Sequence, residues 1–307
     1  MMELIAKLNL MGLRAKFNLV LLAAFAIGFL AAAIVLNRVF NDNAREQVLQ
    51  NARLMMTAAN AIRAYTARDL VPLLPMEHDG KFVAQTVPAF AAQRNFKDVQ
   101  AEFTGYTYRE AALNPTNLSN RAQDWEADVI NLFRNDQSRH ELVVERDTPA
   151  GPTLNMARPL TIRAEACLTC HSTPAAAPAA LTRTYGTVNG FGWKLNETIG
   201  AQILTVPMEV PLKLAHDAYV KFLLILIGVF ALVIVVLNVL LHYLVIEPVK
   251  KVSAVADRVS LGEEDVETYV KSGSDEISSL SVSFNRMRES LKHAMEMVAT
   301  RGSRRKS

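Results

Sequence analysis

Two long apolar runs constrain the fold of this chain more than any other feature of its sequence. Phe17–Leu36 has no charged residue over 20 positions, and Phe222–Ile246 has none over 25. A helix needs about 20 apolar residues to cross the hydrocarbon core of a bilayer, so we expect two transmembrane helices. Ala31–Ala33 could mark a signal-peptide cut site, but the first run exceeds the roughly 7 to 15 apolar residues of such a segment. We therefore expect an uncleaved anchor.

Basic residues lie before the first apolar run and after the second, so a chain that crosses the membrane twice has both groups on the same side. They are Lys7, Arg14 and Lys16 before the first run, and Lys250 and Lys251 after the second. Cytoplasmic segments beside membrane helices carry an excess of lysine and arginine, which predicts that both termini are cytoplasmic. We therefore expect a two-pass protein of a bacterial inner membrane, with residues 37–220 in the periplasm.

A Cys-x-x-Cys-His motif in the periplasmic segment carries the clearest chemical information. Cys167, Cys170 and His171 form it, and they use both cysteines of the chain. Two thiols at this spacing can form thioether bonds to the vinyl groups of one haem, and the next imidazole is then held at the iron. The motif predicts one covalent haem c per chain, with His171 as the proximal metal ligand.

Three other interpretations of the motif stay open. A structural zinc site normally needs four Cys or His ligands, and the chain has no further cysteine to supply them. A thioredoxin-like redox pair belongs at a strand-to-helix junction in a βαβ unit, and the sequence lacks that pattern. The third interpretation is a haem-free binding module in which the motif is vestigial.

The periplasmic segment predicts an α+β domain compatible with a PAS-like fold. A helix over about 41–70 continues the first membrane helix and is stopped by Pro72 and Pro75. A second helix places one apolar face in the core, made of Trp125, Val129, Leu132 and Phe133. Residues 141–146 and 153–162 read as a hairpin, and 198–206 as a last strand. We expect helices first and then an antiparallel sheet, with Cys-x-x-Cys-His in the loop between strands.

The chain changes character after the second apolar run. A short amphipathic helix follows Pro248, then a connector with Gly262 and Gly273, then a heptad pattern at Ile277, Leu280, Phe284, Met287, Leu291, Ala294 and Val298. With Pro248 before the first helix and Asp275 and Glu276 before the second, residues 246–298 resemble a HAMP linker. A plain coiled-coil stalk is the alternative. The resemblance implies a homodimer. Because only nine residues follow Val298, we expect the output to come from a separate cytoplasmic protein. The other possibility is that the chain is a relic that has lost its effector.

Several stretches across about 55–210 resemble the single-haem periplasmic sensor domains of bacterial receptors. They are Val87–Phe90, Tyr106–Asn117, Trp125 and Glu126, the Cys-x-x-Cys-His motif, Tyr185 and Gly186, Asn189–Leu195, and Val206–Met208. The resemblance implies a PAS-like domain with Cys167 and Cys170 attached to haem and His171 on the iron. Arg158, which precedes the motif, could pair with a haem propionate, or could be exposed without a partner.

The sixth iron ligand is not fixed by these patterns. Some members of the resembled family place a cysteine of the first helix there, and this chain has no third cysteine. Met55 and Met56 on the helix that leaves the membrane are the first candidates. Other candidates are Met76, Met156, Met208, His78 and His140. Methionine would raise the haem potential, and a second histidine would lower it.

These patterns together predict a membrane-bound haem sensor of redox state or of a diatomic gas. The expected parts are a cytoplasmic N-terminus (1–16), a transmembrane helix (17–36), the haem domain (37–220), a second transmembrane helix (222–246), HAMP (247–298) and a basic tail (299–307). The tail could touch membrane lipid, although a short solvated terminus explains it more simply. The alternative function is a membrane-anchored c-type cytochrome that takes electrons from a periplasmic donor. The net charge of +3 predicts no nucleic-acid partner, and no catalytic constellation predicts an enzyme.

Overall fold

The computed structural model describes residues 11–263 and 266–304, which divide into two compact units. One unit is Val35–Val220, which we call the sheet domain. The other unit, which we call the helical unit, combines the chain up to Ile34 with the chain from Lys221 onward.

Both segments predicted to cross the membrane are helical, and along the chain they lie before and after the sheet domain. The helical stretches Leu13–Leu70 and Glu209–Ser260 are long and apolar enough to cross a membrane. The first consists of α2 (Leu13–Tyr65) and a π-helical turn η1 (Thr66–Leu70), so the anchor does continue into the domain as one helix. The second begins with α7 (Glu209–Leu241) and then has a π-helical turn, η5 (His242–Ile246), which the sequence did not predict.

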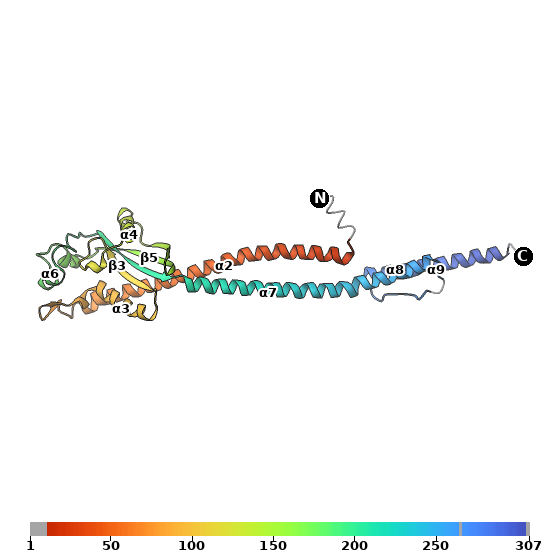
Figure 1. Cartoon of the computed structure of the whole chain (residues 1–307), viewed down its shortest axis with the longest axis horizontal. Helices are drawn as coiled ribbons and strands as arrows, with labels where there is room; N and C mark the ends of the chain where they lie inside the picture. Colours follow the sequence, from red (N-terminus) through yellow and green to blue (C-terminus); the bar gives the residue numbers. More distant parts are fainter. Residues whose placement is uncertain (1–10, 264–265, 305–307) are drawn as a thin grey trace. The chain divides into compact units, whose positions relative to one another are not determined.

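The sheet domain is built around a four-stranded antiparallel sheet with strand order β3-β6-β5-β4 (Figure 1). The strands are β3 (Thr107–Ala112), β4 (Leu142–Thr148), β5 (Gly151–Thr161) and β6 (Thr198–Pro207). The β4–β5 hairpin and the last strand are confirmed. The expectation of helices first and then a sheet is wrong, because β3 precedes the helix at Asp124–Asn135. Both faces of β3 are covered by other parts of the domain, so its residues show little of the apolar–polar alternation that marks a half-buried strand.

Helices cover both faces of this sheet (Figure 1). α2 and α3 (Pro88–Glu102) pack on one face through a core that includes Met56, Phe96, Met156 and Leu204. The other face carries α4 (Asp124–Asn135). These two cores make the domain α+β, as predicted.

The buried face of α4 differs in part from the predicted one. Val129 and Phe133 are buried as expected, but Leu132 is 37% exposed. Glu126 and Ile130 are buried instead. The Glu126 carboxylate accepts a hydrogen bond from the Gln123 backbone N–H at 2.8 Å, which caps the helix, and it lies 3.2 Å from Arg109 Nε on the sheet. A charged residue with two such partners can take a core position.

Short elements complete the sheet domain. They are the hairpin β1 (Glu77–His78) and β2 (Lys81–Phe82), the turns η2 (Ala84–Thr86), η3 (Leu118–Asn120) and η4 (Glu165–Cys167), and the helices α5 (Leu168–His171) and α6 (Ala179–Tyr185). Tyr185 of α6 packs edge-on against Phe82 of β2, with ring centroids 6.1 Å apart.

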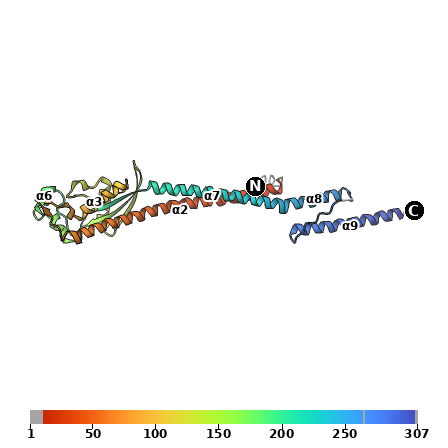
Figure 2. The same ribbon diagram turned by 90° about the horizontal axis from the view of Figure 1, so that it is seen from below.

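The helical unit ends in two helices, α8 (Glu247–Ser260) and α9 (Glu276–Arg304). Figure 2 shows that they lie side by side and run in the same direction. The connector is tied to α9, because Asn285 donates to the Tyr269 carbonyl at 2.7 Å and Arg288 to the Val266 carbonyl at 2.8 Å. Helix, connector and helix therefore occur as predicted.

Candidate functional site: Cys167, Cys170 and His171 at one end of the sheet

The Cys-x-x-Cys-His motif lies in the connection between β5 and β6, as predicted. β5 ends at Thr161, and η4 and α5 then carry Cys167, Cys170 and His171. β3 ends and β6 begins at this same end of the sheet, because Ala112 pairs with Gly200 and Thr161 with Thr198. The motif is thus placed where three strands meet the loops that follow or precede them.

The His171 ring is oriented by two close neighbours, and the Thr116 hydroxyl oxygen lies farther from its Nδ1, at 3.4 Å. Its Nδ1 lies 2.8 Å from the Gly190 carbonyl oxygen, and its ring stacks on Trp193 with centroids 3.8 Å apart and planes 14° apart. A carbonyl can only accept, so Nδ1 carries the hydrogen and Nε2 keeps a free lone pair. Burial lowers the pKa of His171, although the Gly190 carbonyl partly offsets this. The ring is therefore neutral at pH 7 and able to bind a metal through Nε2.

The loop that holds His171 needs a glycine at position 190. Gly190 has φ of +83°, and a Cβ there would overlap the Thr116 hydroxyl. The Gly190 N–H donates to Asn114 Oδ1 at 3.2 Å, and the Trp193 N–H donates to the His171 carbonyl at 3.2 Å. The segments around Asn114 and Gly190, both quoted above for the family resemblance, therefore position the imidazole.

The two thiols are free and half-buried, with no disulfide between them. Burial raises the pKa of Cys170, with a further contribution from Cys167, so this thiol is protonated at neutral pH. Among the described residues no group of three or more His, Cys, Asp or Glu could hold a metal ion. The sheet is antiparallel, without the βαβ unit of thioredoxin-like pairs. Two free thiols beside an imidazole with an available Nε2 fit covalent haem attachment.

The other predicted site residues do not join this group. Arg158 is paired instead with Glu141, with Nη2 and Oε2 2.8 Å apart, and Arg53 shares the same carboxylate at 3.1 Å. Met56 is fully buried in the core under α2, and Met55 packs beside that core.

A buried polar layer between α2 and the sheet was missed by the sequence analysis. The Glu110 carboxylate, 5% exposed, pairs with Arg63 of α2 and accepts a 2.8 Å hydrogen bond from the Tyr108 hydroxyl. Gln202 donates to that hydroxyl and to Asn60 of α2, both at 2.8 Å. Burial and the Glu110 charge raise the pKa of Tyr108, so the hydroxyl stays protonated.

This polar layer lies on the motif side of the methionine core. Glu110 and Gln202 are paired in register, and the next pair on that face toward the motif end is Ala112 and Gly200. Leu204, a neighbour of Met56 in the core, lies two positions the other way. Burial alone would lower the pKa of Arg63, but Glu110, Tyr108 and, more weakly, Cys167 raise it. Arg63 is thus a charged α2 residue whose counter-ion is the buried Glu110 carboxylate.

A sequence signal for this layer exists. Asn60 and Arg63 follow Met56 at i+4 and i+7, so they continue the buried stripe of α2 with polar residues. Polar side chains at core positions are informative, because burial without partners is costly.

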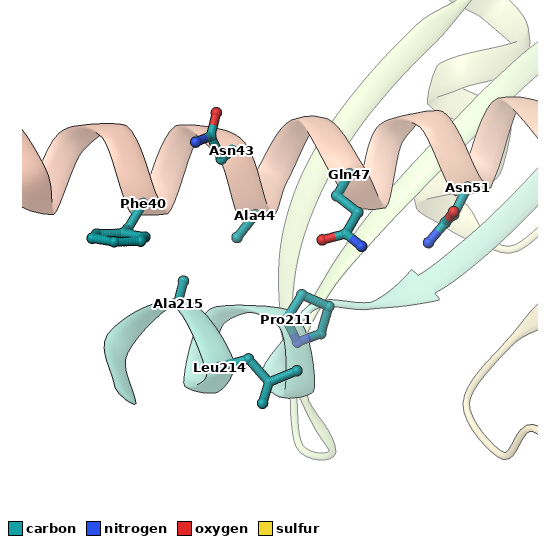
Figure 3. A pocket seen from close by; sticks show the side chains of 8 residues that line it. All are labelled: Phe40, Asn43, Ala44, Gln47, Asn51, Pro211, Leu214 and Ala215. Atoms are coloured by element: carbon teal, nitrogen blue, oxygen red, sulfur yellow. The ribbon is translucent and has the colours of Figure 1, made fainter. Parts of the chain in front are cut away.

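Between α2 and α7 the sheet domain contains a groove of ≈ 290 Å³ (Figure 3). The α2 side contributes Phe40, Asn43, Ala44, Gln47 and Asn51, and the α7 side contributes Pro211, Leu214 and Ala215. It is lined by amides and apolar groups, without acid, base or thiol, so it offers no chemistry comparable with the motif.

Comparison with known proteins matches two separate parts of this chain. Residues 41–207 match the family model Tll0287-like, and residues 240–293 match the HAMP domain. A solved structure described as the crystal structure of the cyanobacterial heme-protein Tll0287 is similar at 17% identity, over 52% of this chain and 94% of that chain, with a TM-score of 0.41. No curated protein matches. Because the first model spans more than half of its residues, the chain belongs to the Tll0287-like family and carries a HAMP domain after it.

Proposed function

We propose that this protein is a membrane-bound haem sensor that signals through its HAMP domain to a separate output protein. Cys167 and Cys170 would hold one haem c covalently, and His171 would be the proximal iron ligand. The observation that carries this proposal is the hydrogen bond from His171 Nδ1 to the Gly190 carbonyl, which leaves Nε2 available. The family's namesake is described as a heme-protein, in line with this assignment. A bound haem would supply an iron centre that changes oxidation state or takes a diatomic gas.

The proposed topology keeps the predicted boundaries. Residues 17–36 and 222–246 would cross a bacterial inner membrane, the PAS-like domain at 37–220 would be periplasmic, and residues 1–16 and 247–307 would be cytoplasmic. Leu280, Met287 and Leu291 of α9 are 48%, 62% and 49% exposed in the single chain. Burying this heptad face needs a partner helix, so we propose a homodimer through HAMP.

Signal transfer would begin at the polar layer. Asn60 and Arg63 attach α2 to β6 and β3 through Gln202 and Glu110. A change of charge beside Cys167 would alter the balance between Arg63 and Glu110, and α2 would then shift against the sheet. β6 leads directly into α7, so both membrane helices are attached to the elements that this layer joins. A difference of a few kcal/mol between two packings is enough to move such an equilibrium.

The distal side of the haem would be exchangeable in this proposal. Met55 and Met56 stay predictions as distal ligands, but Met56 would have to leave a fully buried core position to reach iron. Removing a buried methionine from its core costs about 2 to 5 kcal/mol. An external ligand or a solvent molecule is therefore the better distal partner for a resting sensor.

The test is an optical spectrum of the full chain, produced in a host that attaches c-type haem and reconstituted in nanodiscs. We expect haem bands that move when carbon monoxide is added to the reduced protein. His171→Ala should abolish the native bands, and His140→Ala, at an exposed position, should leave them unchanged. Bands indifferent to carbon monoxide would contradict an exchangeable distal side and favour an electron-transfer cytochrome.

A further inference from the structure

The two candidate membrane helices meet through polar side chains within the helical unit. Asn18 of α2 and Asn238 of α7 exchange two amide hydrogen bonds, at 3.0 and 2.7 Å. Phe25 stacks on Phe230 further along the same contact, with centroids 4.7 Å apart. The helices are therefore antiparallel and in a fixed register, and reciprocal amides are a recognised link between helices in lipid.

Around the amide pair the contact opens into a groove of ≈ 480 Å³, which extends from Ile234, one helical turn before Asn238, to His242, one turn after it toward HAMP. Its polar residues are Arg14, Asn18, Asn238 and His242, and its other residues are Ile234, Val235, Val239 and Tyr243. The groove thus has a polar end beside an apolar wall. Its size is in the range of about 300 to 1,000 Å³ that small-ligand sites occupy.

The polar end of this groove lacks negative charge. None of its lining residues is acidic, and Arg14 has no ion pair or side-chain hydrogen bond within the described part of the chain. His242 Nδ1 is covered by protein and has no hydrogen-bond partner among the described residues. A cation and an imidazole beside the membrane surface can together bind an anionic lipid head group. They match an anion that brings its own apolar chains.

We propose that this groove binds the phosphate of an anionic phospholipid in the leaflet on the HAMP side. Arg14 would pair with the phosphate, His242 would donate a hydrogen bond, and Ile234, Val235 and Val239 would contact an acyl chain. Basic pockets between membrane helices are known to hold lipid head groups in this way. A quinone would satisfy His242 but would leave the Arg14 charge unpaired.

The position of the groove gives the lipid a way to influence signalling. His242 is the first residue of η5, the π-helical turn that joins α7 to α8. The Leu244 carbonyl in this turn accepts a hydrogen bond from Lys271 of the HAMP connector at 3.5 Å. π-Helical turns often mark functional positions in helices. Lipid at His242 would therefore stabilise one geometry of the joint between membrane helix and HAMP.

The test uses the full chain in nanodiscs of phosphatidylcholine with a fixed fraction of phosphatidylglycerol, and native mass spectrometry to count retained lipids. We expect the protein to retain phosphatidylglycerol in preference to phosphatidylcholine. Arg14→Gln should reduce this retention about fivefold, which corresponds to about 1 kcal/mol for one charge at a membrane surface. Arg14→Lys should preserve it, and Lys16→Gln, which removes an equal charge outside the groove, should have no effect.

His242→Gln provides an independent measurement, because Arg14 keeps its charge. We expect about a twofold loss of retention, the size of one modest hydrogen bond. Helical circular dichroism identifies any variant that fails to fold. The proposal is overturned if Arg14→Gln retains as much phosphatidylglycerol as the wild type, if phosphatidylcholine is retained equally, or if added ubiquinone rather than phosphatidylglycerol occupies the site. Photocrosslinking from position 234 to a second copy of the chain would overturn it as well.

Discussion

The sheet domain and the helical unit each contain a cluster of polar side chains where two elements pack. Every member of the first cluster has a hydrogen-bond or ion-pair partner, and the second cluster has unpaired polar atoms. In the sheet domain Asn60, Arg63, Tyr108, Glu110 and Gln202 all have partners, and the cluster is closed. In the helical unit Asn18 and Asn238 are paired, but His242 Nδ1 beside them has no hydrogen-bond partner in the described chain, and Arg14 is exposed. A closed network favours one packing of α2 on the sheet. The unpaired polar atoms of an incomplete network can form hydrogen bonds or ion pairs with a ligand.

Breaking the closed network should give the largest effect. Arg63→Met leaves the Glu110 carboxylate buried without a counter-ion, and removing one partner of a buried pair costs about 3 to 5 kcal/mol. We expect a loss of about 3 kcal/mol in the free energy of unfolding of residues 37–220, measured by denaturant titration. Arg94→Met, at the exposed pair with Asp98, is the control and should change it by less than about 1 kcal/mol. Equal effects of the two substitutions would mean that the polar layer contributes no more than a surface pair.

Substitutions at two glycines of the loop beside His171 distinguish the effect of a steric clash from the effect of backbone strain. Gly190 and Gly192 have φ of +83° and +79°, but only at Gly190 would a Cβ meet another residue, Thr116. Gly192→Ala should cost about 1 kcal/mol from the backbone alone, and Gly190→Ala about 2 to 3 kcal/mol. Gly190→Ala should also lower the haem content of the purified protein, since it displaces the carbonyl that orients His171. Identical haem content in both variants would show that this carbonyl does not position the ligand.

The pairing of Glu141 with Arg158 and Arg53 predicts a pH dependence. Burial alone would raise the pKa of Glu141, but hydrogen bonds from the two arginines lower it below the ordinary value of 4.5. The stabilisation is therefore present above pH 4.5 and is lost as the pH falls through the lower folded-state pKa. Glu141→Gln should cost about 1 kcal/mol at pH 7, allowing for solvent screening. Denaturant titrations at pH 7 and below pH 4.5 should show this difference shrinking with acid. A difference that grows with acid would contradict the pairing.

The smallest effect is expected at the amide pair between the two candidate membrane helices. Interhelical hydrogen bonds in membranes contribute about 0.6 kcal/mol on average. Asn238→Leu should therefore lower the free energy of unfolding of the full chain in detergent by about that amount, while Asn37→Leu, outside the pair, serves as the control. A loss of about 3 kcal/mol would instead indicate that the pair is as strongly coupled as the buried layer of the sheet domain.

Much of the fold could be predicted from local sequence patterns, and the parts that could not depend on contacts distant in sequence. The apolar runs, the β4–β5 hairpin and the HAMP helices follow from periodicity within single segments. β3 was missed because both of its faces are covered, and Leu132 was placed in the core because Glu126 was not expected there. The motif predicted Cys167, Cys170 and His171 as the haem-binding residues, and this stays a prediction. Arg63 was missed because its partner, Glu110, is 47 residues away. The pairing of Arg158 with Glu141, 17 residues away, could not be predicted either, and a contact of Arg158 with a haem propionate stays a prediction.

The most direct test of the central claim is the mass of the intact chain after denaturation and acid–acetone extraction, which removes haem that is not covalently bound. Expression in a host with c-type maturation machinery should give a chain heavier by one haem. The double variant Cys167→Ser/Cys170→Ser should have the mass of the polypeptide alone. A wild-type chain at the polypeptide mass, from a host that matures another c-type protein normally, would contradict covalent haem and with it the proposed sensor.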